Sequence, residues 1–249
     1  MSALKLYAYG RYQADKVWSI SKNRVVNRLY YVNSGTAYIR NASKEYRLIS
    51  GKIYIIPGSS DFLPLDAKGF DHTFFDYCST RALRRNEITE IDASQLSVNK
   101  LFDYINALIE NDTSWRLSSQ MELFLSGLLS TLELFCGNDI HYIANPSVNS
   151  AVELIHSRYD SISTGQLAES LNLNESYFIR MFRREMGTSP LKYIRSLKAL
   201  RGRELLECGL SVAEASYKCG YSSPISFNKA IRAEFSCSPL ELKSSKIKV

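Results

Sequence analysis

The chain has 249 residues, of which 45% are apolar and 22% are charged, and its formal net charge is +6. This composition is ordinary for a globular protein and excludes a disordered, collagen-like or low-complexity chain. No apolar run approaches the roughly 20 residues that a membrane helix needs, and the N-terminus is too polar for a signal peptide. We therefore expect a cytoplasmic protein of one large or two small domains, with no membrane partner.

The first ninety residues are predicted to form a β domain. Runs rich in aromatic and β-branched residues cover 28–32, 36–40, 45–49, 52–56 and 71–77. The first two runs flank Asn33-Ser34-Gly35, which fits a three-residue hairpin loop. Several short strands of this kind are typical of a small sandwich or barrel. Residues 1–15 precede them and are interpreted as an arm over a pocket in this domain.

Residues 94–136 change to helical periodicity, with apolar residues at intervals of three and four over 98–109 and again over 121–132. The second run also has Leu123 and Leu134 outside its main stripe, so its apolar face is wide and needs more than one neighbour.

Two compatible interpretations of this helical segment remain open. Its helices pack against the β domain, or residues 96–135 form the interface of a homodimer in which the second helix meets its copy. If the second interpretation holds, a charged residue at Leu125 or Leu128 gives monomers.

A domain boundary is predicted at residues 137–147. Residues 148–249 contain 15 Lys and Arg against 10 Asp and Glu, whereas residues 1–147 contain 16 against 15, so the positive charge is concentrated after the boundary. A local basic excess favours a polyanionic partner. After the boundary every predicted element is a helix, at 148–159, 165–171, 175–185, 190–207 and 212–218, with a last one from Ser222 or Ser223 to Phe235.

Residues 180–191 and 229–240 form a repeat with a constant spacing of 49. The aligned pairs are Arg180 with Lys229, Phe182 with Ile231, Arg183 with Arg232, Glu185 with Glu234, and Ser189-Pro190-Leu191 with Ser238-Pro239-Leu240. The repeat indicates one helix-turn-helix unit that is present twice.

Each unit has a small residue where its two helices cross, Ala168 in the first and Ser216 in the second. A helix-turn-helix motif places its second helix in the DNA major groove. The connecting helix at 190–207 has 18 residues, hence a length of about 27 Å. With the half-widths of the two units added, this length suits two major-groove faces about 34 Å apart, which is one turn of B-DNA.

These residues resemble the AraC/XylS family of bacterial transcription regulators. QLAESLNLNESYFIRMFRREMGTSPLKYI (166–194) is similar to the family's first unit, and LSVAEASYKCGYSSPISFNKAIRAEFSCSPLEL (210–242) is similar to its second unit. The chain departs from the family pattern at Ala215-Ser216 (usually Ile-Ala), at Ile231 (usually Phe) and at Ser236 (usually Gly). These departures are expected to weaken packing in the second unit.

The resemblance implies an α+β protein with two domains. Residues 1–136 would be a cupin-like β-barrel with a helical dimerisation segment at about 95–136, residues 137–147 a linker, and residues 148–249 the all-α double helix-turn-helix domain. It further implies a homodimeric, nucleoid-associated regulator of bacterial promoters that binds double-stranded DNA, contacts RNA polymerase if it is an activator, and is not an enzyme.

In the first unit, the family's base-reading positions fall on Ser176, Ile179 and Arg180. Arginine hydrogen-bonds guanine with two N–H groups, and an isoleucine contacts a thymine methyl. A phosphate contact or a structural ion pair remains an alternative for Arg180. Arg183 and Arg184 lie further along the helix and are expected to contact phosphate or solvent.

In the second unit the same transfer gives Pro224, Ile225, Asn228 and Lys229. Pro224 and Ile225 have no side-chain hydrogen-bonding atoms, whereas Asn228 suits adenine and Lys229 suits guanine or phosphate. A second unit that mainly binds the DNA backbone is an equally good interpretation. The helix N-termini at Asn174 and Ser223 also suit phosphate contacts.

Family members often bind a small molecule, frequently a sugar, inside the barrel. By strand alignment the effector-binding positions fall on Ser34, Phe62, His72 and Phe74, with an ordinary core role as the alternative for His72. Only His72 lies in the β domain among the three histidines, and the five cysteines form no C-x-x-C pair, so neither a metal nor another cofactor is expected.

Three other functions are alternatives to a ligand-controlled regulator. A cupin-class enzyme lacks its histidine-rich metal set here, and no nucleophile with a base is apparent, so no catalytic residue is assigned. A DNA-repair protein with an alkyl-accepting cysteine needs an N-terminal cysteine cluster, but the first cysteine is Cys78. A regulator that is controlled by a protein partner or by its own abundance remains open.

Overall fold

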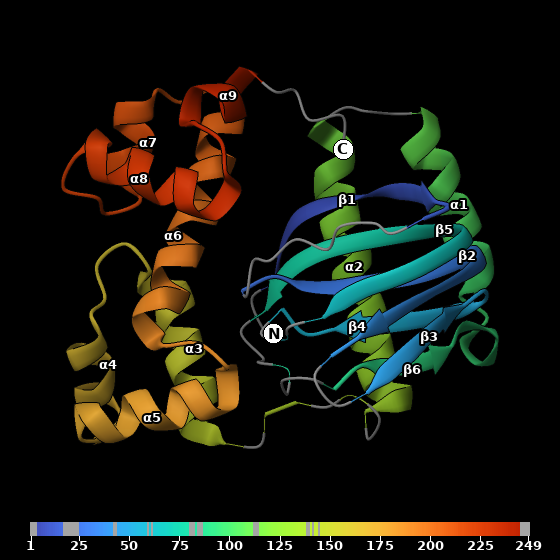
Figure 1. The fold of residues 1–249 in the computed structure, drawn as a ribbon, viewed down its shortest axis with the longest axis horizontal. Coiled ribbons are helices and arrows are strands. Elements are labelled where there is room, and N and C mark those ends of the chain that lie inside the picture. The colour runs from blue at the N-terminus through green and yellow to red at the C-terminus, as the bar shows by residue number, and fades with distance from the viewer. Residues whose placement is uncertain are drawn as a thin grey trace.

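The computed structural model describes residues 4–16, 25–41, 44–58, 60, 62–79, 83, 87–111, 115–137, 140, 142–143 and 145–244. One half of the molecule is a curved β-sheet with two helices, and the other half is entirely helical, so the predicted α+β class is confirmed (Figure 1). No helix in these ranges is both long and apolar enough to cross a membrane.

The sheet is antiparallel and open. Its strands are β1 (Leu4–Ala14), β2 (Asn27–Arg40), β3 (Glu45–Ile49), β4 (Lys52–Ile56), β5 (Leu63–Ser79) and β6 (Thr89–Asp92). Their order is β1-β5-β2-β4-β6, and β3 pairs with β2. Since β1 and β6 do not pair among the described strands, the predicted closed barrel is not confirmed.

The predicted hairpin at Asn33-Ser34-Gly35 is wrong, because these residues lie inside one continuous strand. β2 pairs with β5 along its length, and its register shifts on both sides of Ser34. Gly35 has φ +73°, and a Cβ atom there would lie 2.0 Å from the carbonyl oxygen of Gly69 on β5. The two glycines therefore let both long strands bend together, as in a β-bulge.

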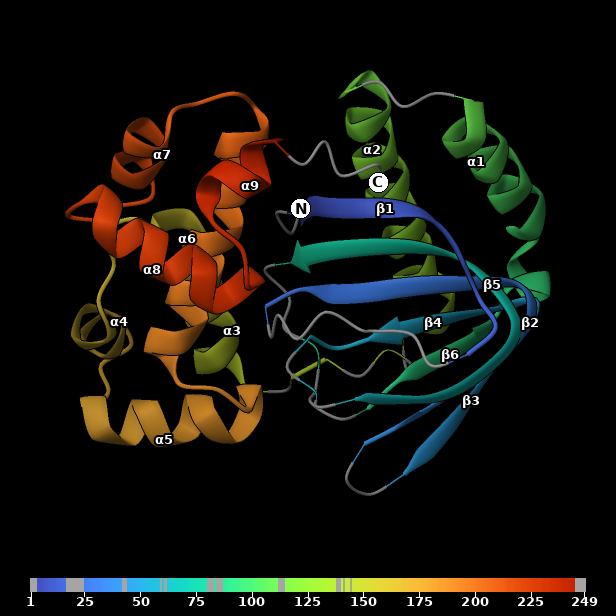
Figure 2. The same cartoon turned by 45° about the horizontal axis from the view of Figure 1, so that its top comes forward.

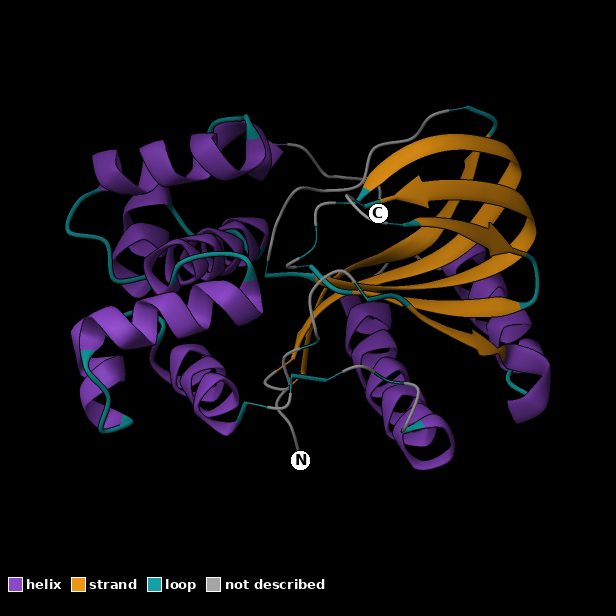
Figure 3. Ribbon diagram, turned by 60° about the horizontal axis from the view of Figure 1, so that its bottom comes forward, coloured by secondary structure: helices purple, strands orange, loops and turns teal. Residues whose placement is uncertain are grey.

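β1 is a strand rather than the arm that was predicted for residues 1–15, and it pairs with β5 from Leu4 to Ala14. It lies at the edge of the sheet, beside α1 (Asn99–Asn111) and α2 (Trp115–Cys136), which follow the short 3-10 helix η1 (Ala93–Leu96). Both helices cover one side of the sheet (Figure 3).

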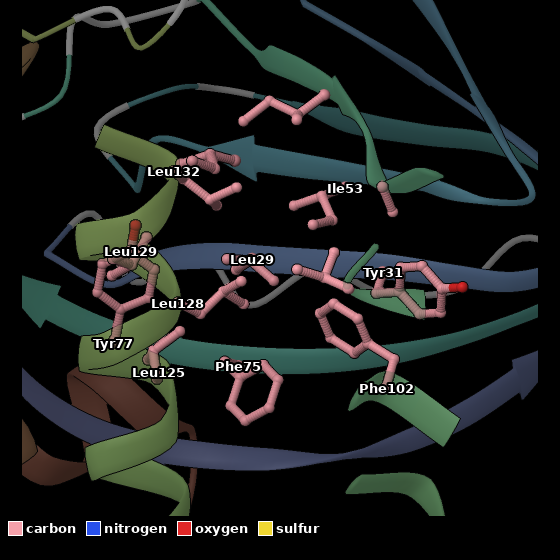
Figure 4. Packing of buried hydrophobic residues seen from close by; sticks show 14 of the residues in the cluster. Leu29, Tyr31, Ile53, Phe75, Tyr77, Phe102, Leu125, Leu128, Leu129 and Leu132 are labelled. Atoms are coloured by element: carbon pink, nitrogen blue, oxygen red, sulfur yellow. The ribbon is translucent and has the colours of Figure 1, made fainter. Parts of the chain in front are cut away.

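The main core of this half lies between the sheet and α2. Leu29 and Phe75 point from the sheet toward Leu125 and Leu128 (Figure 4). Both leucines are buried within the single chain. A charge at Leu125 or Leu128 is therefore expected to disrupt this core, and the structure gives neither leucine as a contact available to a second protomer.

The remaining apolar side chains of α2 lie on its opposite side. Leu123, Leu134 and Phe135 are exposed, with Leu134 at 78%. The two residues that lay outside the main stripe in the sequence, Leu123 and Leu134, are therefore mostly exposed in the described chain.

The helical half contains α3 (Pro146–Arg158), α4 (Thr164–Ser170), α5 (Glu175–Met186), α6 (Pro190–Glu207), α7 (Val212–Lys218), α8 (Pro224–Phe235) and α9 (Pro239–Ser244). α3 begins inside the predicted 137–147 linker, where Asn145 accepts hydrogen bonds from two backbone N–H groups as N-cap. α4 is capped by Ser163, together with Gln166, one residue earlier than expected.

The two halves are in contact. Val25, Val26 and Cys78 from the sheet half belong to the same buried cluster as the core of α3 to α6. Lys5 on β1 forms a 2.8 Å ion pair with Glu204 on α6. The linking helix of the helical half is thus joined directly to the edge strand of the sheet.

Candidate nucleic-acid interface

α5 has the local chemistry of a recognition helix. Asn174 caps its start by accepting hydrogen bonds from the backbone N–H groups of Ser176 and Tyr177. Phe178 and Phe182 are fully buried on its inner face. Gly187 ends the helix with φ +64°. These features fix the helix so that its opposite face points to solvent.

The predicted base-reading residues lie on that outer face. Ser176 and Arg180 are exposed, and Ile179 is half-buried between them. Arg183 and Arg184 follow on the same side, also exposed, and Arg184 forms a 2.9 Å ion pair with Glu185. The first unit therefore presents a continuous basic surface, and its role in reading DNA stays a prediction.

α8 repeats this construction with different outer residues. Ser223 caps it, and Phe227 and Ile231 are fully buried on its inner face. Ile225 is 71% exposed, and Lys229 is exposed.

Two other predicted residues of α8 are less accessible than Ile225 and Lys229. Pro224 is half-buried at the first helical position. Asn228 is half-buried too, and its Oδ1 accepts a 3.2 Å hydrogen bond from Arg232 Nε, which limits its freedom to bind a base.

The two recognition helices are held by α6, which has the 18 residues that the sequence predicted. Both α5 and α8 begin on the side of the domain away from the sheet and run back toward it (Figures 1 and 2). The early turns of a recognition helix are the part that enters the major groove. In this molecule the early turns of α5 and α8 lie on the same side (Figures 1 and 2), so both can face one DNA duplex.

Three residues on this side were not predicted. Tyr177 is half exposed beside Arg180, and Arg195 and Lys198 of α6 line a cleft between the two units. The repeat of 49 residues draws attention to α5 and α8 only, so α6 was treated as a spacer. The basic residues at 195 and 198, which lie three positions apart on one helix face, were the available signal.

The predicted effector residues are only partly brought together. His72 and Phe74 lie close, with ring centroids 6.2 Å apart. Phe62 is buried against Tyr46 in the same core cluster. Ser34 is exposed at the bend of β2, where its hydroxyl donates a 3.4 Å hydrogen bond to the Gly69 carbonyl, so it does not share this environment.

His72 is the centre of an aromatic cluster. Its ring stacks on Phe70 at 4.4 Å and contacts Tyr30 and Tyr12 at 4.6 and 5.9 Å. Burial lowers the pKa of His72 to about 4, so the ring is neutral at pH 7. Its Nδ1 atom is buried and has no hydrogen-bond partner in the described structure, a rare state for a buried polar atom.

A polar network occupies the other face of the same strands. Arg11 on β1 donates to Asp71, and Asn33 donates to both Asp71 and Thr73. Thr73 and Asn33 also bond Asn106 of α1. The hydrogen bond from Arg11 lowers the pKa of Asp71. The strand that carries His72 is thus tied to both β1 and α1.

Comparison with known proteins supports the division of the chain into a sheet half and a helix-turn-helix half. Residues 167–245 match a family model described as a helix-turn-helix domain. The chain is similar to the Msm operon regulatory protein of Streptococcus mutans (36% identical, 39% of this chain and 35% of that one). It is also similar to the lactose operon transcription activator of Staphylococcus xylosus (26%, 41% and 37%), and to the transcriptional activator RhaS of Escherichia coli O139:H28 (27%, 35% and 32%). The matches span about a third of the length of these curated relatives.

Solved structures of ToxT from Vibrio cholerae share the fold over nearly the whole chain. One, bound to (E)-4-(8-methylnaphthalen-1-yl)but-3-enoic acid, has a TM-score of 0.58 at 14% identity and covers 95% of this chain and 98% of that one. Another, described as unsaturated fatty acid bound, has a TM-score of 0.54 at 13% identity and covers 100% and 96%. The open sheet joined to a helical half is therefore a known arrangement.

Proposed function

Because residues 167–245 form an AraC-type helix-turn-helix domain, we propose that this chain is a sequence-specific transcription regulator that binds bacterial promoter DNA. The main support is the pair of recognition helices, which repeat at 49 residues and carry exposed basic residues beyond a buried inner face. The two helices bind adjacent major grooves on one side of the duplex.

Selection of bound fragments from genomic DNA tests this function. The full chain is expected to enrich two short boxes about one helical turn apart, with affinity that falls steeply as salt rises. Strong binding without a shared motif would contradict sequence-specific regulation. The genes beside enriched sites then indicate the regulated pathway. Because two of the relatives are activators, we propose that this chain activates transcription through RNA polymerase, in the cytoplasm.

The second part of the proposal is that a small molecule bound at the aromatic cluster around His72 controls DNA binding. Tyr12 on β1 lies against His72, and five residues earlier Tyr7 lies 5.6 Å from the guanidinium of Arg201 on α6. β1 therefore connects the aromatic cluster to the linking helix. A ligand that moves β1 changes how α6 is held.

A neutral polar ligand such as a sugar suits this cluster better than a carboxylate. The neutral His72 ring offers one hydrogen bond and no positive charge, and aromatic rings surround it. Sugars and long-chain fatty acids are the two ligand classes to screen, since relatives regulate a lactose operon and a ToxT structure holds a fatty acid.

Thermal unfolding provides the readout for that screen, because a ligand of the native state raises the Tm, and the stabilisation grows with the logarithm of its concentration over Kd. A sugar is expected to raise the Tm of the wild type and to leave that of His72→Phe unchanged. A stabilising fatty acid would replace the sugar in the proposal. If neither class of ligand raises the Tm, control by a protein partner or by the abundance of the protein is favoured instead.

We also propose that the exposed face of α2 pairs two chains. Leu134→Asp is expected to give monomers in sedimentation without lowering the free energy of unfolding, because this leucine lies outside the core. Leu125→Asp is the matched control and is expected to unfold the sheet half, since it buries a charge. A dimer that survives Leu134→Asp would move the interface elsewhere.

A further inference from the structure

A cleft of about 540 Å³ lies between the two helix-turn-helix units, on neither recognition helix's outer face. Its walls come from both units and from α6, and include Gly165, Glu175, Arg195, Lys198 and Tyr221. None of these residues is among the predicted DNA contacts.

The base of the cleft is held rigidly. Lys198 donates hydrogen bonds to the carbonyls of Asp160 in the first unit and of Gly220 in the second, at 3.0 and 3.2 Å. Gly220 has φ +69°, and a Cβ atom there would lie 1.8 Å from the Asp160 carbonyl oxygen. The two units therefore touch at this point, and the Lys198 ammonium fixes their separation.

The cleft also contains unused hydrogen-bond donors. Arg195 is exposed, and its guanidinium makes no hydrogen bond or ion pair with the described residues. Arg195 and Lys198 outnumber Glu175, the acidic residue of the lining, so the site favours an anion.

The geometry of B-DNA places such an anion opposite this cleft. When two recognition helices occupy major grooves one turn apart on the same side of a duplex, the minor groove between them faces the protein. The two sugar–phosphate strands that border this minor groove then lie between α5 and α8, where α6 and the cleft are located.

We infer that the cleft is a backbone-binding site in which Arg195 contacts a phosphate of the DNA between the two half-boxes. Arg195 is the phosphate ligand, because its guanidinium presents several N–H donors and has no hydrogen-bond or ion-pair partner among the described residues. Lys198 acts as a positioning residue, since two of its three N–H groups are taken by carbonyls. This inference rests on the proposed function and adds a contact that depends on the spacing of the boxes.

Binding of the full chain to a duplex with the selected motif tests the site. Arg195→Ala is expected to weaken binding about five- to tenfold and to lower the slope of log affinity against log salt by about one, with no change in base preference. Lys192→Ala is the matched control, because it removes one charge from the same helix outside the cleft and is expected to leave affinity within twofold.

Uncharged methylphosphonates at the phosphates between the half-boxes locate the contact. They are expected to weaken the wild type but not to weaken Arg195→Ala further. The inference would be overturned if the methylphosphonates weakened Arg195→Ala by the same factor as the wild type. It would also be overturned if Arg195→Ala bound the unmodified duplex like the wild type. Failure of the proposed function is distinct, because the wild type would then show no preference for any motif before a variant is made.

Discussion

The two helix-turn-helix units share their inner construction and differ on their outer faces. Phe178 and Phe182 in the first unit correspond to Phe227 and Ile231 in the second, and all four are fully buried. At the outer positions the first unit has Ser176, Ile179 and Arg180, and 49 residues later the second has Ile225, Asn228 and Lys229. The buried faces of α5 and α8 are alike because both must pack against a core, whereas their exposed faces differ and suit different parts of the DNA.

The difference teaches where specificity is expected. Arg180 makes no hydrogen bond or ion pair within the described structure, so its guanidinium is available to a base, whereas Asn228 is bonded to Arg232. We therefore assign base reading mainly to the first unit and backbone binding mainly to the second. Four predictions test this contrast, starting from the largest effect.

Gly202→Ala is expected to loosen the second unit alone. A Cβ atom at Gly202 on α6 would lie 2.4 Å from the ring of Phe227, which is fully buried. Overpacking of this kind lowers the free energy of unfolding by about 3 kcal/mol. Hydrogen exchange should show faster opening of α7 and α8 than of α4 and α5.

The control is Gly127→Ala on α2, where an added Cβ meets nothing within 4 Å. It is expected to raise stability by up to about 1 kcal/mol, because alanine is the better helix former. Equal behaviour of the two variants would show that Gly202 has no packing role.

Arg180→Ala is expected to reduce affinity for the selected motif about thirtyfold, which corresponds to about 2 kcal/mol of base discrimination. Binding to a scrambled duplex should change little. Lys229→Ala, at the equivalent position of the second unit, should weaken both duplexes equally. If Lys229→Ala relaxes base preference as strongly as Arg180→Ala, both units read sequence and the assignment above is wrong.

Acid is expected to weaken the first unit before the second. His156 on α3 bonds the Tyr193 hydroxyl at 3.1 Å, and the second unit contains no histidine. Burial, helped by Arg201, lowers the pKa of His156 to about 4. The unfolded chain, with a histidine pKa near 6.5, binds the proton more readily. This contribution to stability is therefore present above about pH 6.5 and is lost as the pH falls toward 4.

At pH 5.5 the expected loss is about 1 kcal/mol, because the histidine is then mostly protonated in the unfolded chain and still mostly neutral in the folded one. Hydrogen exchange of α3 and α5 at pH 7 and 5.5 measures it, with α7 and α8 as the internal reference. His156→Gln should remove the difference between the two pH values. A pH effect that persists in this variant would assign it to other groups.

The sequence predicted the helical half far better than the sheet. Each recognition helix combines local signals, such as Asn174 and Ser223 as caps, with a repeat that checks them, so most of the predicted boundaries agree with the structure to within one or two residues. The sheet depends on distant partners. β1 was missed because it is an edge strand whose one partner among the described strands is β5, more than fifty residues away.

The bend at Gly35 and the cleft at Arg195 show two further limits. A glycine after Asn33-Ser34 has the composition of a hairpin loop, and only the close approach of Gly69 reveals a bent strand instead. The cleft forms where Asp160, Lys198 and Gly220 meet. Asp160 and Gly220 lie in turns of the two units and Lys198 lies on α6, and no local pattern links the three residues. Both features arise from tertiary contacts that local patterns do not record.

The smallest expected effect concerns the ends of the two recognition helices. Gly187 ends α5 with φ +64°, and Ser236 ends α8 with φ +58°, at positions 49 residues apart. Left-handed backbone is unfavourable for a residue with a Cβ atom, so the second unit is less well terminated than the first. Ser236→Gly is expected to raise the free energy of unfolding by about 0.5–1 kcal/mol, and Gly187→Ser to lower it by a similar amount. Thermal unfolding measures both, and a destabilised Ser236→Gly would show that the serine makes a compensating contact and that the two units are terminated equally well.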